Sequence, residues 1–549
     1  MSSTRITLGL LLCFGVAFLP MNSLARQRRR TLNSQARLMA GLGKVHHPVS
    51  TKIQQAQRFF DQGLALVYGF NHEEAQRFFQ RAAELDPQLA MAWWGVAFSL
   101  GPNYNFPVDP AKEKAAFEAI QKAIALQENA SEAERAYINA LAFRYSNDAK
   151  ADFRQLDIAY RAAMAKLTTR YPDDLDAATL YAGSVMNLNP WKLWLHDGRP
   201  NEGTEEIVAV LESVLKRDPN HIGANHYYIH AIEASPYPER GLASAVRLET
   251  LAPGAGHLTH MPSHIYSRVG DHPASVRSNI KAVTADRLFL SGKSNPGMEN
   301  AMLAVHNVHF LAYAHCMNGN FGGAKAAADE LVARVQPQLK EMPMLEGFLP
   351  TRLVVFMAFE RWNDLVQLPA PDASLPVTTA EWHFARAVAL AKLGKTDFAE
   401  KEKLKWRKAA SQIPAETIII ELNTAGDVFK VHENLLSAAI AGSRRDNKAA
   451  VDFLKQAVAA QDALNYSEPP AFYPPVRGLL GRALLEAKQF PEAERVFRAD
   501  LEKNPRYGRD LVGLRDSLRA QSRENEAVLV EQQLQVTDSA VVSPVKRRR

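Results

Sequence analysis

Five histidines fall within two short stretches, NHYYIHAIEAS at 225–235 and GHLTHMPSHIY at 256–266, although the whole chain of 549 residues has only 16. His226 and His230 are four residues apart, as are His260 and His264, and the second pair follows the first after 34 residues. Neutral imidazole is a strong ligand for Zn, Cu, Ni and Fe, and a carboxylate often completes the coordination shell. Two histidines at i and i+4 lie on one helix face, so each pair could bind one ion. The pattern therefore predicts a transition-metal site.

Two other interpretations of the same histidines remain open. A row of imidazoles can bind a peptide or an anion by hydrogen bonds, or it can pack between helices, with its polar atoms satisfied by Glu233, Tyr227, Tyr266 or the backbone. The zinc-protease motif HExxH is absent, so the sequence does not indicate a peptidase.

The spacing of 34 residues matches an internal repeat. In the stretch 56–89, small residues stand at repeat positions 8, 20 and 27 (Gly63, Ala75 and Ala82), with Phe79 at 24 and Pro87 at 32. This is the pattern of the tetratricopeptide repeat (TPR), a hairpin of two antiparallel helices in which small residues allow close approach and proline ends the second helix. Good matches recur from 431 and 474, and partial ones from 222, 305 and 380. The sequence predicts an all-α fold, a right-handed α-solenoid of TPR-like hairpins.

The repeat frame also predicts where the histidines point. Frames starting at 222, 256 and 305 place His226, His260 and His309 at position 5, and His230, His264 and Tyr313 at position 9. His257 and His306 take position 2, and Glu233 takes position 12. Positions 2, 5, 9 and 12 share the face of the first helix that lines the concave groove, so these side chains should converge in one groove.

Candidate site residues follow from this placement. The predicted metal ligands are His226, His230, His257, His260, His264 and His306. Glu233 or His309 could act as a catalytic acid or base if the centre is an enzyme. Tyr227, Tyr313, Asn187 and Trp191 are candidate ligand-binding residues, the last two because an aromatic loop at 185–200 interrupts the repeats just before the histidines. The cofactor would be a divalent transition metal (Zn, Cu, Ni or Fe), and the partner a protein, peptide or small molecule in the concave groove.

The termini and the composition indicate an exported protein. Residues 1–25 carry a basic start, an apolar run from Ile6 to Leu19 and the small-residue site SLA, which is typical of a signal peptide. Arginines just after that site leave a retained N-terminal membrane anchor as an alternative. The net charge of +6 comes from the two terminal segments, so the charge pattern does not favour nucleic-acid binding. Only Cys13 and Cys316 occur, which excludes a disulfide framework and a cysteine-based zinc site.

These signals divide the chain into six parts. We expect a signal peptide at 1–25, a basic irregular segment at 26–50, an N-terminal TPR solenoid with the histidine-rich groove at 51–338, degenerate helices or a linker at 339–379, C-terminal TPR repeats at 380–530, and a disordered basic tail at 531–549. No further stretch is apolar over enough residues to span a membrane, and nucleotide-binding fingerprints are absent.

With these motifs in view, the chain resembles a group of exported bacterial TPR proteins of about this length. The resemblance is carried by FDQGLALVYGFNHEEAQRFFQRAAELDPQLAMAWWGVAFSLGPNYN, NHYYIHAIEAS, GHLTHMPSHIYSRVGD and PVRGLLGRALLEAKQFPEAERVF, and it extends from His46 to about residue 518. It implies the repeat fold and export rather than a particular chemistry. The main functional hypothesis is therefore an exported TPR protein that binds a ligand or partner and carries a histidine-rich metal site, and the alternative is a metal-dependent hydrolytic or redox enzyme on the same scaffold.

Overall fold

The computed structural model describes residues 36–107, 109–148, 150–291, 293, 297–420 and 422–542, with side chains described to residue 535. The expected signal peptide, the first part of the basic N-terminal segment and the last residues of the basic tail lie outside these ranges. Among the described residues, no helix is both long enough and apolar enough to cross a membrane.

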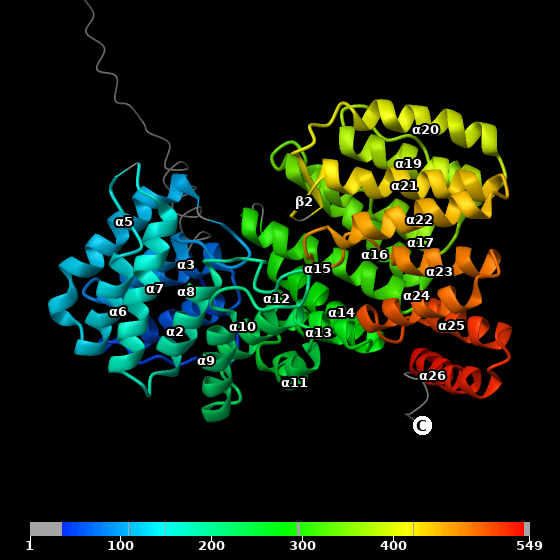
Figure 1. Ribbon diagram of the computed structural model, residues 1–549. Helices are drawn as coiled ribbons and strands as arrows, with labels where there is room; N and C mark the ends of the chain where they lie inside the picture. Colours follow the sequence, from blue (N-terminus) through cyan, green and yellow to red (C-terminus); the bar gives the residue numbers. More distant parts are fainter. Residues whose placement is uncertain are drawn as a thin grey trace, which may run out of the picture.

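Antiparallel helical hairpins follow one another along the chain, which confirms the predicted all-α solenoid of TPR-like repeats (Figure 1). The N-terminal hairpins pair α2 with α3, α4 with α5, α6 with α7 and α8 with α9. Their bounds are Gln54–Tyr68, His72–Leu85, Ala90–Leu100, Pro110–Ala125, Glu132–Ala142, Phe153–Arg170, Leu175–Met186 and Thr204–Arg217, with a 3₁₀ turn at Gln127–Asn129.

The middle hairpins carry the histidine-rich stretches. They comprise α10 (Ile222–Glu233), α11 (Leu242–Leu251), α12 (Gly256–His260), α13 (Pro262–Arg268), α14 (His272–Leu290), α15 (Met298–Met317) and α16 (Phe321–Val335), with 3₁₀ turns at Pro238–Gly241 and Gln336–Gln338. The expected first helix of the second histidine repeat is split into α12 and α13 because Pro262 has no backbone N–H to donate.

The C-terminal part begins with short helices, in the segment where degenerate ones were expected. They are the 3₁₀ helix Pro343–Phe348, α17 (Thr351–Ala358) and α18 (Trp362–Gln367). Longer hairpins follow: α19 (Pro376–Lys392), α20 (Thr396–Ala410), α21 (Ala425–Ser443), α22 (Asn447–Asp462), α23 (Val476–Glu486), α24 (Phe490–Lys503), α25 (Gly508–Ala520) and α26 (Glu524–Val542), with a small antiparallel pair of β1 (Ile418–Ile420) and β2 (Asn423–Thr424).

The end of the chain departs from the expectation of a disordered tail from residue 531. Helix α26 continues through 531 to Val542, because its apolar residues Ala527, Val530 and Leu534 pack in the same core as Leu514 and Leu518 of α25. Residues 531–542 are therefore helical where a disordered tail was expected.

Small residues at the predicted positions explain why neighbouring helices approach so closely. A Cβ atom added to Gly63 or to Gly95 would lie 2.7 or 2.4 Å from the buried Phe79 ring. Thus Phe79 of α3 fills a space that glycines of α2 and α4 leave open. Phe497 fills the corresponding space between Gly481 and Gly513, where an added Cβ would lie 2.5 or 2.2 Å from its ring. The repeat signature is therefore a packing rule at both ends of the chain.

The C-terminal hairpins bend back toward the middle ones. In Figure 1, the chain runs from α2–α8 through α10–α15 to α19–α22, and then returns below them along α23–α26. Arg268, at the end of α13, donates a hydrogen bond to the carbonyl oxygen of Lys503 at 3.4 Å. The histidine-rich helices are thus held between the N-terminal repeats and the returning C-terminal repeats.

Candidate metal centre

The first histidine triad comes from α10 and α12. His226, His230 and His257 each offer a ring nitrogen within 4.8 Å of the other two. His226 and His230 lie one turn apart on α10, and His257 approaches them from the next repeat, with ring centroids 5.0 Å from His226 and 6.2 Å from His230. All three side chains are buried.

Hydrogen bonds hold the outer nitrogens of two of these rings. The His226 Nδ1 contacts the carbonyl oxygen of Tyr68 at 2.5 Å, and the His230 Nδ1 contacts Oε1 of Glu233 at 2.9 Å. Both partners are acceptors, so each Nδ1 carries the proton and each Nε2 presents a bare lone pair. The Nε2 atoms of His226 and His230 and both ring nitrogens of His257 have no hydrogen-bond partner although they are buried. Buried polar atoms are rarely left unpaired, and a bound cation would satisfy all three rings.

The second triad lies next to the first and comes from α12, α13 and α15. The Nε2 of His260 lies 2.7 Å from Nε2 of His264 and 3.0 Å from Nε2 of His306. The two triads adjoin each other, since the ring centroids of His257 and His260 are 5.9 Å apart and those of His230 and His264 are also 5.9 Å apart.

The tautomers of the second triad follow from the outer partners of its rings. Asn279 donates its amide N–H to the carbonyl oxygen of Ser275, so its Oδ1 is the atom that accepts from His260 Nδ1 at 2.7 Å. The Nδ1 of His264 contacts Oε2 of Glu233. The Nε2 atoms of His260 and His264 face each other at 2.7 Å, so one proton or one bound cation fits between them.

Glu233 joins the two triads. One carboxylate oxygen holds His230 and the other holds His264, and the side chain is 1% exposed. Burial opposes its ionisation, but the His264 and His230 imidazoles outweigh that effect and keep the pKa of Glu233 below its ordinary value. A carboxylate that holds the outer nitrogen of a metal-binding histidine fixes the ring orientation and raises its basicity. Glu233 thus orients one imidazole in each triad through that ring's Nδ1.

Five of the six imidazoles have pKa values below the ordinary value for histidine. Burial is the main cause, and neighbouring histidines add to it, so the pKa values of His226, His257, His260 and His306 lie well below the usual value of 6.5. The pKa of His230 is also lowered, mainly by burial. Because metal ligation requires neutral imidazole, the lowered pKa values of these five rings favour the protonation state that a transition metal needs.

Aromatic side chains enclose the centre. Phe70 lies against His226 with ring centroids 4.5 Å apart, Tyr104 lies 5.0 Å from His230, and Phe310 stacks on His264 at 4.9 Å. These histidines are therefore enclosed by aromatic side chains rather than exposed to solvent. His306 alone of the six is only partly buried, so the second triad is the one nearest to solvent.

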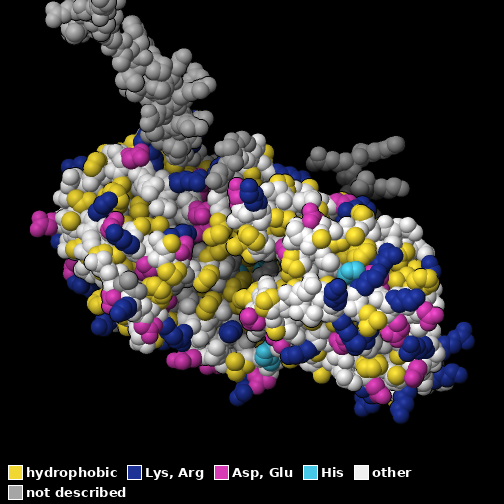
Figure 2. Space-filling view, turned by 90° about the horizontal axis from the view of Figure 1, so that it is seen from above, with side chains coloured by type: hydrophobic (Ala, Val, Ile, Leu, Met, Phe, Trp, Pro, Cys, Tyr) yellow, Lys and Arg dark blue, Asp and Glu magenta, His cyan; other side chains and the backbone are white. Residues whose placement is uncertain are grey.

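The surface is nevertheless hollowed close to the middle of the molecule. Figure 2 shows a hollow between the N-terminal and C-terminal halves, with hydrophobic side chains around its rim.

The structure places the remaining predicted residues around the triads or away from them. Trp191 stacks on Tyr104 and lies 6.0 Å from His230, and Tyr227 is buried against Phe70. Trp191 and Tyr227 therefore pack around the imidazoles without joining either triad. Asn187 lies away from the triads and donates a hydrogen bond to the carbonyl oxygen of Pro102 at 3.4 Å.

His309 and Tyr313 do not join either triad. The His309 ring contacts Phe348, and its Nε2 lies 3.4 Å from the hydroxyl of Tyr473, while Tyr313 packs on Tyr473. The repeat frame placed His306 and His309 on the same face of this helix, but only His306 reaches a triad, with its Nε2 3.0 Å from that of His260.

Several residues of the centre had no signal in the repeat pattern. Asn279 on α14, Phe70 and Tyr104 reach the triads only through packing between repeats. Glu468 comes from much further along the chain and is buried near His264 and Glu233; burial raises its pKa above the ordinary value. Glu468 is so far from the histidines in the sequence that no local motif could indicate its place in the centre.

A third group of possible ligands is already satisfied by protein partners. His47 contacts Asp176 at 2.8 Å, His221 contacts the same carboxylate at 3.2 Å, and Tyr137 donates to Asp174 at 2.8 Å. This group is a network of polar contacts that ties the irregular N-terminal segment to the starts of α8 and α10.

Fold and site together define a helical-repeat protein with a buried centre of six histidines. No protein-family model matches the chain, and no curated protein matches it. Solved structures that are similar to it include the Cut9–Hcn1 hetero-tetramer of APC/C (11% identity, 95% of this chain and 79% of that chain, TM-score 0.32) and yeast Tom70 (10%, 90% and 93%, 0.29). Human IFIT1 bound to m7Gppp-AAAA is also similar (10%, 78% and 87%, 0.36). Scores this low support no inference about function.

Proposed function

We propose that this protein binds two transition-metal ions, one in each histidine triad, and that metal binding at this buried centre is its defining activity. The observation that carries the proposal is the first triad, in which three buried imidazoles face one another with unpaired nitrogens while a carbonyl and a carboxylate hold the outer nitrogens of two of them. Six imidazoles favour Zn, Cu, Ni or Fe over the oxygen-preferring Mg and Ca.

Elemental analysis of the purified chain tests the proposal. We expect about two equivalents of a transition metal per chain, either as isolated or after addition of Zn²⁺, Cu²⁺, Ni²⁺ or Fe²⁺ to protein treated with a chelator. His257→Phe should remove one equivalent and His260→Phe the other. His72→Phe is the matched control, because His72 is also buried but contacts the carbonyl oxygen of Gly101 outside both triads. A chain that binds none of these four metals contradicts the proposal.

A metal-dependent enzyme is the second candidate. Three protein ligands leave a fourth coordination position for water or substrate, which is the arrangement of catalytic zinc sites. The partial exposure of His306 favours the second triad for this role. Ester or phosphoester hydrolysis by the metal-loaded chain, lost in His306→Ala with the first triad still loaded, would support it. Metal-loaded protein without such activity leaves metal binding as the function.

Export of the chain is part of the same proposal. The leader-like residues 1–25 support export. Appearance of a shortened chain starting near residue 26 in the periplasmic or culture fraction tests the location. Retention of the full-length chain in the membrane fraction would favour the anchor instead.

A further inference from the structure

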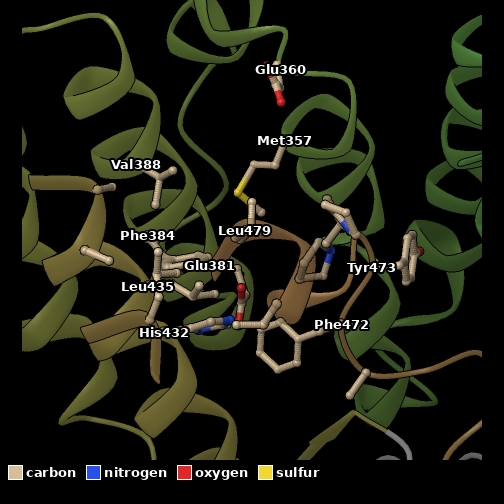
Figure 3. Close-up of a pocket in the computed structure, with 18 of the residues that line it drawn as sticks. Met357, Glu360, Glu381, Phe384, Val388, His432, Leu435, Phe472, Tyr473 and Leu479 are labelled. Atoms are coloured by element: carbon tan, nitrogen blue, oxygen red, sulfur yellow. Dashed lines mark ion pairs between the residues drawn. The ribbon is translucent and has the colours of Figure 1, made fainter. Parts of the chain in front are cut away.

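A second site lies on the inner face of the C-terminal repeats, apart from the histidine triads. A cavity of about 320 Å³ is lined by α17, α19, α21 and α23, the first helices of successive hairpins, and by the segment 470–474. Its size falls in the range of small-molecule sites. Most of its walls are apolar, for example Met357, Val388, Leu435 and Leu479 (Figure 3).

Two buried polar side chains face each other inside this cavity. Glu381 of α19 and His432 of α21 are 6% and 3% exposed, and the His432 Nδ1 lies 3.6 Å from Oε1 of Glu381. Neither of these two atoms has a hydrogen-bond partner. In Figure 3 both side chains point into the same space, with Phe472 beside them. An unpaired carboxyl and an unpaired imidazole in an apolar cavity leave hydrogen-bonding capacity for a ligand.

The other charge-bearing residues around the cavity do not neutralise this carboxyl. Glu360 and Arg509 form an ion pair with each other at 3.1 Å, and Lys392 and Glu486 are exposed. Arg482 on α23, His309 on α15 and Tyr473 complete the ionisable lining. Burial alone raises the pKa of Glu381 to about 8 and lowers the pKa of His432 to about 3.

Aromatic rings surround the pair of polar groups. Phe384 stacks on His432 with ring centroids 3.9 Å apart, and Phe472 lies 5.4 Å from it. Aromatic faces attract an organic cation, and a cation beside a buried carboxyl restores the charged carboxylate by ion pairing. A neutral ligand offers no such gain.

We propose that this cavity binds a hydrophobic amine, with the ammonium group on Glu381 and the alkyl or aryl body against the apolar walls. The inference is independent of the metal centre, since none of the six triad histidines lines the cavity.

Calorimetric titration of the full chain with octylamine, and with 1-octanol as the neutral probe of equal length, tests the proposal. At pH 7 we expect the amine to bind at least about tenfold more tightly than the alcohol, and binding to release close to one proton per amine as Glu381 ionises. Titration in buffers of different ionisation enthalpy measures that proton.

Three variants make the outcome decisive. Glu381→Gln keeps the shape of the side chain, so it should lose the preference for the amine and the proton release but retain octanol binding. Glu402→Gln is the matched control, because Glu402 is also buried but pairs with His383 at 2.6 Å outside the cavity, and it should bind the amine like the parent chain. Val388→Trp fills the cavity and should weaken both probes.

Three results would overturn the inference: equal affinity for the two probes, unchanged amine affinity in a folded Glu381→Gln variant, or binding of neither probe.

Discussion

Replacing His257 by phenylalanine should change the stability of the protein in opposite directions without and with metal. His257 is 5% exposed, and neither ring nitrogen has a hydrogen-bond partner, although one carries a proton and the other a lone pair. Leaving a buried polar group unpaired costs about 1–3 kcal/mol. Phenylalanine has a similar flat ring without polar atoms. In the metal-free chain, His257→Phe should therefore raise the free energy of unfolding by about 1–3 kcal/mol, less any strain from the larger ring.

In the presence of metal, the same substitution should be unfavourable. His257 is the member of the first triad that approaches from the neighbouring repeat, so its loss leaves only the two imidazoles of α10. A ligand that binds only the folded state stabilises it in proportion to the logarithm of its concentration over Kd. The variant should thus gain much less stability on metal addition than the parent chain does.

Denaturant unfolding with a chelator and with excess Zn²⁺, together with elemental analysis, measures both effects. His72→Phe is the control and should behave in the opposite way, since it removes a hydrogen bond to the carbonyl oxygen of Gly101: it should lose about 1 kcal/mol without metal and keep its full metal content. If His257→Phe destabilises the metal-free chain and leaves the metal content unchanged, then His257 is a packing residue and the first triad is not a metal site.

Other substitutions probe the rest of the reasoning. Glu233→Gln should weaken metal binding at both triads by about 10–100-fold, because Glu233 orients one imidazole of each triad. Glu402→Gln should leave metal binding unchanged. Isothermal titration with Zn²⁺ measures both affinities, and a loss at one triad only would disprove the bridging role. Gly95→Ala should destabilise the chain by about 1–3 kcal/mol, because the added Cβ would lie 2.4 Å from the buried Phe79 ring. Gly442→Ala is the control and should not destabilise it, because a Cβ there meets nothing within 4 Å. Thermal unfolding compares the two variants. Burial raises the pKa of Glu381 from 4.5 to about 8, so between these pH values the folded chain keeps a proton that the unfolded chain releases. The free energy of unfolding should therefore fall by about 1.4 kcal/mol for each pH unit above 4.5, or by about 3 kcal/mol at pH 7. Glu381→Gln should abolish this loss in unfolding curves recorded from pH 5 to 8, and an unchanged pH dependence would refute the assignment.

The repeat fold could be predicted from the sequence because its packing rule is local. Gly63, Phe79 and Pro87 recur at fixed spacing, and each acts on helices that are adjacent in the chain, so the pattern already contains the contact between Phe79 and its glycines. The sequence did not predict that the last helix extends past residue 530, because Val530 and Leu534 alone form a weak amphipathic pattern. Their burial against α25 is visible only in the structure.

The histidine centre could be predicted only in part. The spacing of His226, His230, His260 and His264 brings these rings together because the repeat places equivalent residues on adjacent helices. The sequence named both His306 and His309, and only the structure shows that His306 joins a triad while His309 contacts Phe348 and Tyr473. Packing of the rings between helices was one of the interpretations left open, and the residues that enclose them, Phe70 and Tyr104, come from distant segments.

The sequence by itself determined that the chain forms helical hairpins and that imidazoles from successive hairpins meet, because both follow from a period of 34 residues. Only the tertiary structure decided that the histidines divide into two triads with Glu233 between them, and that Glu381 and His432 face each other across a cavity. The physical reason is that the direction of a side chain and the removal of water around it depend on every element packed against it, including segments hundreds of residues away.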